Sequence, residues 1–166
     1  MLIKKNINHP KYIFWISVLI IWIISTIADR IWWNFYSDTP SWDQADYLNS
    51  ALDHARALSF FGADGGSSFS SLLDKSPKIP PLASIINGAL ISFAGEAPHE
   101  AAWSLSFWNG FLIFNIASWG LYLRGEKFAL FSVLISAFSP FLFYLRTDYV
   151  LELPLISSIA FYLFHL

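Results

Sequence analysis

The sequence contains no cysteine and little charge. Of its 166 residues, 13% are charged and 55% are hydrophobic, whereas a soluble globular domain averages about 25% charged residues. The absence of cysteine excludes disulfides, thiolate metal sites and a cysteine nucleophile. The net charge of −2 provides no basic face for nucleic acid. With 16 phenylalanines and 8 tryptophans, too few polar groups remain to cover a water-facing surface, so we expect an integral membrane protein.

Charge is absent altogether from a long run near the N-terminus, residues 12–28. As a helix this run is about 25 Å long, close to the minimum for crossing a hydrocarbon core of about 30 Å. Lys4, Lys5 and Lys11 precede it, and an excess of lysine marks the cytoplasmic side. A signal peptide has the same layout, but no small-residue cleavage site ends the run. We therefore predict an uncleaved anchor with a cytoplasmic N-terminus.

Residues 29–100 are predicted to form a loop on the outer face, and residues 29–80 are its polar part. Within this loop, Ser41 and Gln44 are spaced as a capping box, and apolar residues then recur at helical spacing. This pattern predicts an amphipathic interfacial helix at about 42–60. The apolar stretch 81–94 is about 21 Å long as a helix, which is short for a crossing and favours an interfacial or re-entrant helix.

Three further apolar runs are predicted to cross the membrane, at about 101–123, 128–144 and 151–166. Arg124 and Lys127 then lie in a cytoplasmic turn, in agreement with the positive-inside rule. The predicted fold class is all-α: a single membrane domain, built as a polytopic bundle with amphipathic juxtamembrane helices in its first outer loop. Because the last run ends without a polar flank, we expect the chain to be the N-terminal part of a longer protein.

The predicted topology places three polar clusters on the outer face. In the first cluster, Asp43 falls in the first turn of a helix, where the helix dipole favours a carboxylate. An ionised carboxylate there could accept a proton from a hydroxyl group or hold a divalent cation. The alternative is that Asp43 only stabilises the start of its helix, and spacing alone favours this plainer interpretation.

The second and third clusters place cations and an acid next to apolar runs. Lys78 precedes Pro81, which is well placed to open a helix, so Lys78 could bind a phosphate beside a helix N-terminus or simply contact lipid headgroups. Glu152 lies at the edge of an apolar run, where an acid is costly without a partner or a function. Arg146 could clamp a phosphate, or it could pair with Asp148 or Glu152. The four histidines do not have the spacing of metal ligands.

In this order along the chain, the clusters resemble motifs of the membrane glycosyltransferases of the C-type fold, among them the protein O-mannosyltransferases and the lipid A aminoarabinose transferases. An Asp-Glu-x-x-Tyr motif of that family is matched by Asp43-Gln44-Ala45-Asp46-Tyr47, with Gln44 at the second acidic position. A Lys-Pro-Pro-Leu-like motif is matched by Lys78-Ile79-Pro80-Pro81-Leu82, with Ile79 inserted. A Ser-Pro, an arginine and an acid before an apolar run are matched by Ser139-Pro140, Arg146 and Glu152-Leu153-Pro154-Leu155. The resemblance covers nearly the whole chain.

The resemblance implies a transferase that moves a sugar from a polyprenyl-phosphate donor to a hydroxyl of a lipid, glycan or protein at the outer membrane face. It implies that Asp43 is the catalytic base and that Glu152 assists in catalysis. The residues expected to bind substrate are Lys78 and Arg146, at the carrier phosphate, with Asp46 and Tyr47 of the first motif. A divalent cation is the one cofactor that this arrangement could use.

A second hypothesis, from a different class, is a non-enzymatic membrane scaffold subunit or a transporter fragment. Transporters place polar groups near the bilayer midplane. The middles of the spans predicted here hold little beyond serines and the two asparagines Asn109 and Asn115. This distribution disfavours a transport path, and a scaffold subunit is the stronger competitor.

Overall fold

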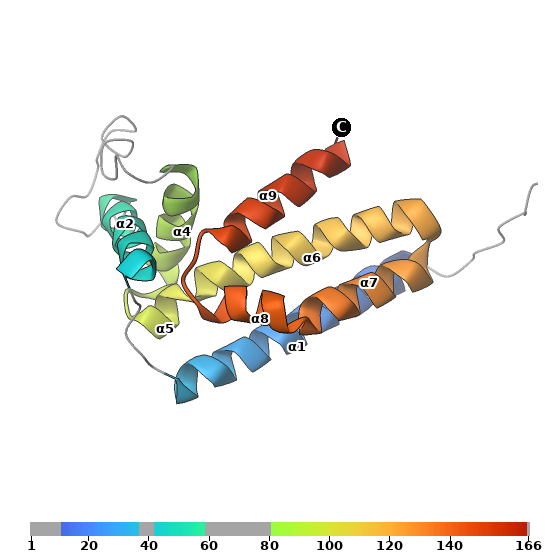
Figure 1. The fold of residues 1–166 in the computed structure, drawn as a ribbon, viewed down its shortest axis with the longest axis horizontal. Coiled ribbons are helices and arrows are strands. Elements are labelled where there is room, and N and C mark those ends of the chain that lie inside the picture. Colours follow the sequence, from blue (N-terminus) through green and yellow to red (C-terminus); the bar gives the residue numbers. More distant parts are fainter. Residues whose placement is uncertain (1–10, 37–41, 59–80, 166) are drawn as a thin grey trace, which may run out of the picture.

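The computed structural model describes residues 11–36, 42–58 and 81–165, and every regular element among them is a helix (Figure 1). The helices are α1 (Lys11–Phe35), α2 (Trp42–Leu58), α4 (Pro81–Ala94), α5 (Pro98–Ala101), α6 (Trp103–Arg124), α7 (Glu126–Phe138), α8 (Pro140–Thr147) and α9 (Glu152–His165). The described ranges contain no strand, so the predicted all-α fold class is confirmed.

Helix α1 is longer than predicted. It continues past residue 28, where we expected the outer loop to begin, and ends at Phe35. The physical reason is that Asp29 does not face water: its side chain is fully buried within the bundle, where it has a cationic partner described below. Within the described residues, Tyr12–Phe35 is the one single helix that is long and apolar enough to cross a membrane.

The range predicted as one span at 128–144 is not a straight helix. Helix α7 ends at Phe138, and α8 begins at Pro140 after a bend of 55°. Pro140 has no N–H for the helix ladder and its ring clashes with the preceding turn, so α7 cannot continue, whereas the fixed φ of proline suits the first turn of α8. If α7 and α8 count as one broken span, the described residues contain up to two helices that could cross a membrane. The bundle of four spans stays a prediction.

Helix α6 is the centre of the bundle, with α7 and α9 packed along it and α1 packed against both α6 and α7 (Figure 1). It begins at Trp103, two residues later than predicted, because the short helix α5 occupies Pro98–Ala101. A Cβ at Gly120 would lie 2.6 Å from the Cα of Ala129, so only glycine permits this close approach of α7. Gly125 then forms the turn between α6 and α7 with a φ of 86°, a conformation that favours glycine.

Helices α2 and α4 form a closely packed pair at one end of the molecule (Figure 1). A Cβ at Gly88 of α4 would lie 2.7 Å from Cβ of His54 and 2.9 Å from the carbonyl oxygen of Ala51, so the two backbones approach as closely as glycine allows. Helix α4 occupies the predicted range, and α2 is amphipathic as predicted. The exposed polar residues of α2 are Asp43, Asp46, Asn49, Asp53 and Arg56.

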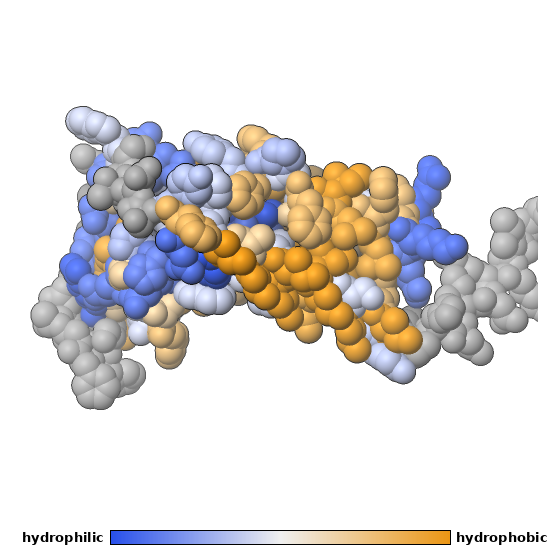
Figure 2. Space-filling model, turned by 90° about the horizontal axis from the view of Figure 1, so that it is seen from below, coloured by the Kyte–Doolittle hydropathy of each residue, from blue (hydrophilic) through white to orange (hydrophobic). Residues whose placement is uncertain are grey.

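The two ends of the long axis carry the polar parts of the chain. The start of α1 and the α6–α7 turn lie at one end, and α2, α4, α5 and the α8–α9 connection lie at the other (Figure 1). Figure 2 shows a broad hydrophobic band between hydrophilic ends. Exposed isoleucines of α1 belong to the apolar surface: Ile13, Ile16, Ile20, Ile23, Ile24, Ile27 and Ile31. An apolar surface of this extent marks a face that contacts lipid or another protein.

Candidate functional site

The first turn of α2 lies beside the connection between α8 and α9. The side-chain amide of Gln44 donates a hydrogen bond of 3.0 Å to Oδ2 of Asp148, although the two residues are 104 positions apart. The other carboxylate oxygen, Oδ1, accepts a hydrogen bond of 3.0 Å from the backbone N–H of Tyr149. These two bonds hold Asp148 in place, and the first and third polar clusters of the sequence therefore meet at this corner.

The residues of the first motif differ in their exposure. Asp43 and Asp46 are exposed to solvent on α2, whereas Tyr47 is half-buried and packs against the main apolar core. Gln44 stands at the position where the family motif has its second acid, and it is the residue that bonds to Asp148. Asp43 is next to it in the first helical turn, so an exposed carboxylate lies close to the α8–α9 connection.

A pocket of about 370 Å³ adjoins this corner. Glu152, the first residue of α9, is exposed and forms part of the pocket wall. The rest of the wall is almost wholly apolar and comes from α4, α6 and α9 with the residue before it: Leu82, Ala83, Trp108, Leu151, Pro154, Leu155 and Ser158. One acid on an apolar wall suits a ligand with a polar end and an apolar body.

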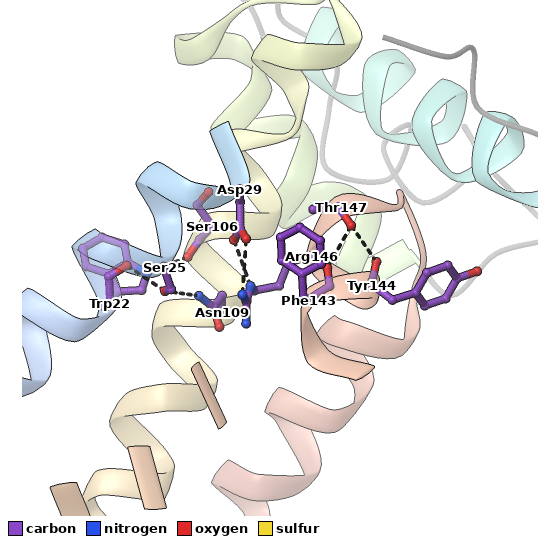
Figure 3. A network of polar contacts seen from close by, with 9 residues as sticks. All are labelled: Trp22, Ser25, Asp29, Ser106, Asn109, Phe143, Tyr144, Arg146 and Thr147. Atoms are coloured by element: carbon purple, nitrogen blue, oxygen red, sulfur yellow. Dashed lines mark hydrogen bonds and ion pairs between the residues drawn. The ribbon is translucent and has the colours of Figure 1, made fainter. Parts of the chain in front are cut away.

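Arg146 does not point into this corner. Its side chain is 2% exposed and forms a two-pronged ion pair with Asp29 of α1, with distances of 2.8 Å from Nε to Oδ2 and 3.2 Å from Nη2 to Oδ1 (Figure 3). The predicted alternative of a pair with Asp148 or Glu152 is therefore wrong. The nearer acids in sequence lie beyond the end of α8, whereas Asp29 is inside the bundle, where a buried guanidinium needs a carboxylate most.

The ion pair belongs to a larger group of buried polar side chains between α1, α6 and α8 (Figure 3). The amide of Asn109 donates to Oγ of Ser25 at 3.2 Å, and the indole N–H of Trp22 donates to the carbonyl oxygen of Ser106 at 3.0 Å. Nη1 of Arg146 is buried and has no hydrogen-bond partner among the described residues. This group is charged and retains unsatisfied donors.

A second buried polar group joins α4, α6 and the α8–α9 connection. The indole N–H of Trp108 donates to Oδ1 of Asn87 at 2.6 Å, and the hydroxyl of Tyr149 lies 3.2 Å from Oγ of Ser104. Burial raises the pKa of Tyr149 to about 12, and its hydrogen bonds with Ser104 and Asn87 act in the opposite direction. Tyr149 is thus a neutral phenol, and its hydrogen bonds hold the chain in place directly after Asp148.

Our reading of the sequence missed Asp29, Asn87 and Tyr149 as members of buried networks. The available signal was a polar residue in or beside an apolar stretch, because such a residue needs a partner within the protein. Glu152 also lies beside an apolar run, but it is exposed and not part of a buried network. The sequence could show that partners were required but not which residues they were.

Some predicted site residues lie outside the described ranges. Lys78 and the proposed helix cap Ser41 are in this class. Pro81 is described and begins α4, as its place in the sequence predicted. Within the described ranges, no three histidine, aspartate or glutamate side chains are grouped so that they could hold a metal ion.

No protein-family model, no curated protein and no solved structure matches this chain. The structure alone therefore gives the class of fold: the described residues are all-α, and at least one helix is long and apolar enough to cross a membrane.

Proposed function

We propose that this chain carries the catalytic corner of a membrane glycosyltransferase that moves a sugar from a polyprenyl-phosphate donor to a hydroxyl of a lipid, glycan or protein. The hydrogen bond between Gln44 and Asp148 is the observation that supports this proposal most directly. It holds the two motif-bearing segments together, so that Asp43 and Glu152 belong to one end of the molecule. An apolar pocket adjoins the same end, and Glu152 is on its wall.

In the proposed reaction, Asp43 is the general base. The acceptor hydroxyl loses its proton to the Asp43 carboxylate as its oxygen attacks the anomeric carbon of the sugar. The bond between that carbon and the phosphate oxygen breaks, and polyprenyl phosphate leaves with the electron pair. The resemblance implies inversion at the anomeric carbon. Exposure of Asp43 fits this role, because the acceptor must reach it.

The other motif residues support binding. Lys78 is proposed to hold the carrier phosphate, with Asp46 and Tyr47 contacting the sugar or acceptor. Direct contact between Arg146 and that phosphate would require the guanidinium to leave Asp29, because the pair is buried. Its role in the proposal is therefore to hold α8 against α1, and thereby to position the connection that carries Asp148.

The proposal places the chain in the cell membrane with several spans and a cytoplasmic N-terminus. Lys11 begins α1 at the end of the molecule where Arg124 and Lys127 flank the α6–α7 turn (Figure 1). Basic residues gathered at one end favour the cytoplasmic side for that end. The corner with Asp43 and Glu152 then faces the outer side, where donor headgroups lie.

Substitution of the base tests the proposed reaction. In membranes containing the full chain, Asp43→Asn should lower sugar transfer from a labelled mannosyl- or aminoarabinosyl-phosphopolyprenol by at least about 100-fold, because general-base catalysis contributes about 10²–10⁴-fold. The measurement is the label transferred to the acceptor fraction. Asn has nearly the same shape as Asp, so membrane insertion and the contacts of α2 should be unchanged.

Asp53→Asn is the matched control, because Asp53 is also an exposed acid of α2 but lies about three turns from Asp43. It should transfer sugar at the unmodified rate. A non-enzymatic scaffold subunit predicts that the two substitutions behave alike. Undiminished transfer by the Asp43→Asn protein would remove Asp43 from the mechanism.

A further inference from the structure

A second pocket lies on the side of the bundle where α1, α4 and α6 meet, away from the corner with Asp43. Its volume is about 450 Å³, and its wall is mainly aromatic and aliphatic. The wall includes Trp22 of α1, Leu90 and Phe93 of α4, and Trp103 and Phe107 of α6. Phe93 is 92% exposed, and Trp103 and Phe107 are also exposed, so the pocket opens to the surroundings of the protein.

The hydroxyl of Ser106 on the pocket wall, and that of Thr26 on the neighbouring turn of α1, lack the hydrogen bond that helical hydroxyls usually make. Oγ of Ser118 and of Ser136 each donate to a carbonyl oxygen one turn earlier in their own helix, at 2.8 and 2.9 Å. Ser106 lines the pocket and is only 3% exposed, yet its Oγ has no partner among the described residues. Oγ1 of Thr26 is also buried without a described partner. Thr26 lies one turn after Trp22, on the same face of α1.

A cation completes this row of donors. Arg30 lies one turn beyond Thr26 on α1, and its guanidinium carbon is 5.2 Å from the centre of the Trp103 ring, which is part of the pocket wall. Nη1 of Arg30 donates to the carbonyl oxygen of His99 at 3.3 Å, whereas Nε and Nη2 are buried without a partner in the described residues. The neighbouring carboxylate of Asp29 already binds Arg146 through both oxygens.

We propose that this pocket binds an anionic phospholipid, with an acyl chain against Trp22 and Phe107 and the phosphate on Arg30. A half-buried guanidinium with two unsatisfied donors needs an acceptor with negative charge, and a phosphate oxygen pair matches its fork geometry. Thr26 lies on α1 between Trp22 and Arg30, so in this arrangement the hydroxyls of Thr26 and Ser106 would serve the ester oxygens between headgroup and chain. A wholly apolar partner, such as a helix of another protein, would leave all these donors without acceptors.

The site is independent of the proposed transferase. It uses α1, α4 and α6, and it shares no residue with the pocket beside Glu152. Failure of the lipid experiment would leave the proposed reaction untouched, and inactivity of the chain as a transferase would leave the lipid site untouched.

Quenching of tryptophan fluorescence tests the proposal, since Trp22 and Trp103 line the pocket. The full chain in detergent micelles is titrated with phosphatidylglycerol brominated on one acyl chain and, separately, with phosphatidylcholine carrying the same brominated chain. Half-maximal quenching should need roughly fivefold less phosphatidylglycerol, because an arginine near a membrane surface is worth about that factor for an anionic lipid. Glycerol 3-phosphate should not compete, because it lacks the chain.

Three variants decide which residues are responsible. Arg30→Gln should abolish the preference for phosphatidylglycerol, whereas Arg124→Gln, which removes an exposed arginine at the far end of α6, should keep it. Ala94→Phe retains Arg30 and fills part of the pocket, so it should weaken quenching by both lipids. Far-ultraviolet circular dichroism and elution volume verify that each variant is folded.

Equal quenching of the unmodified chain by the two lipids would overturn the proposal, and so would a preference that persists in folded Arg30→Gln protein. Displacement of the brominated lipid by glycerol 3-phosphate would also overturn it, because the site would then bind a free phosphate ester. If Arg30→Gln does not fold, the unmodified chain and Ala94→Phe decide: quenching by both lipids that is unchanged in Ala94→Phe places the lipid elsewhere.

Discussion

Two of the buried polar groups described above join separate helices in different ways. One joins α1 to α8 through the Asp29–Arg146 ion pair, whose side chains are 0% and 2% exposed. The other joins α4, α6 and the α8–α9 connection through neutral side chains, with Asn87 bonded to Trp108 and Tyr149 to Ser104. The charged group retains an unsatisfied nitrogen, Nη1 of Arg146, whereas none of these four neutral side chains has a buried atom without a partner.

This difference indicates different uses. A neutral network in which every polar atom has a hydrogen-bond partner holds the surrounding helices in one arrangement. It becomes destabilising only when one of its members is removed. A buried ion pair stabilises little on balance, because desolvation offsets most of the attraction, but removal of one partner leaves an isolated buried charge. We therefore expect the charged group to be the more sensitive of the two to single substitutions and the less sensitive to their combination.

The largest effect is expected when one charge of the pair is removed. Arg146→Met should lower the free energy of unfolding by about 3–5 kcal/mol, because it leaves the Asp29 carboxylate buried without its partner. The measurement is unfolding in mixed micelles with rising sodium dodecyl sulfate, followed by circular dichroism.

The combined variant Asp29→Leu with Arg146→Met sharpens this test. With both charges replaced by apolar side chains of similar size, stability should return to within about 1 kcal/mol of the unmodified protein. An Arg146→Met protein that unfolds within about 0.5 kcal/mol of the original would show that water reaches the pair, and the contrast with the neutral network would be lost.

A smaller loss is expected in the neutral group. Asn87→Leu leaves the Trp108 indole N–H without its acceptor, whereas Tyr149 keeps its bond with Ser104. One buried group left unsatisfied costs about 1–3 kcal/mol, so the loss should be of that size. The same unfolding measurement applies. Unlike Arg146→Met, this variant leaves no buried charge, so no second substitution is expected to restore its stability.

Asn115→Leu is the matched control. Asn115 is also a buried asparagine, but its amide donates at 2.7 Å to the carbonyl oxygen of Phe111 in its own helix and joins no second helix through that bond. Its replacement should change stability by less than about 1 kcal/mol. Equal losses in the two asparagine variants would show that the bond between α4 and α6 has no special weight.

Most helices of this protein could be predicted from the sequence, whereas their distant partners could not. The helices followed from local signals: α4 from Pro81 and a short apolar run, α2 from its amphipathic spacing, and the α6–α7 turn from a basic stretch with Gly125. Local signals sufficed because helix formation depends on neighbours in the chain. For the site, we expected Asp43, Lys78, Arg146 and Glu152 to converge on one pocket. Glu152 is on a pocket wall, but Arg146 points into the bundle and pairs with Asp29, and Lys78 lies outside the described ranges.

Partners distant in the chain could not be predicted in the same way. We expected the first span to end at residue 28, because the charge-free run ends there. The structure continues the helix because Arg146 neutralises the carboxylate of Asp29, 117 positions earlier in the chain. Similarly, the break at Ser139 had a visible signal in Pro140, but whether proline starts a new helix or bends an existing one depends on tertiary packing.

The smallest effect concerns Tyr149, and it depends on pH. Its pKa is raised from 10.0 to about 12 by burial, so the folded protein binds this proton more tightly than the unfolded chain does. The stabilisation is complete below about pH 10 and is lost as the pH rises from about 10 to 12. At about pH 11 this one residue should account for a loss of about 1.4 kcal/mol relative to pH 9.

Comparison with Tyr149→Phe isolates this contribution, because phenylalanine keeps the ring in the core and has no proton to lose. At pH 9 the Phe variant should be less stable than the unmodified protein, because it lacks the hydrogen bond with Ser104. Its stability should nevertheless fall less steeply up to pH 11. If both proteins lose stability in parallel, Tyr149 ionises as freely in the folded protein as in the unfolded chain, and the neutral network is open to water after all.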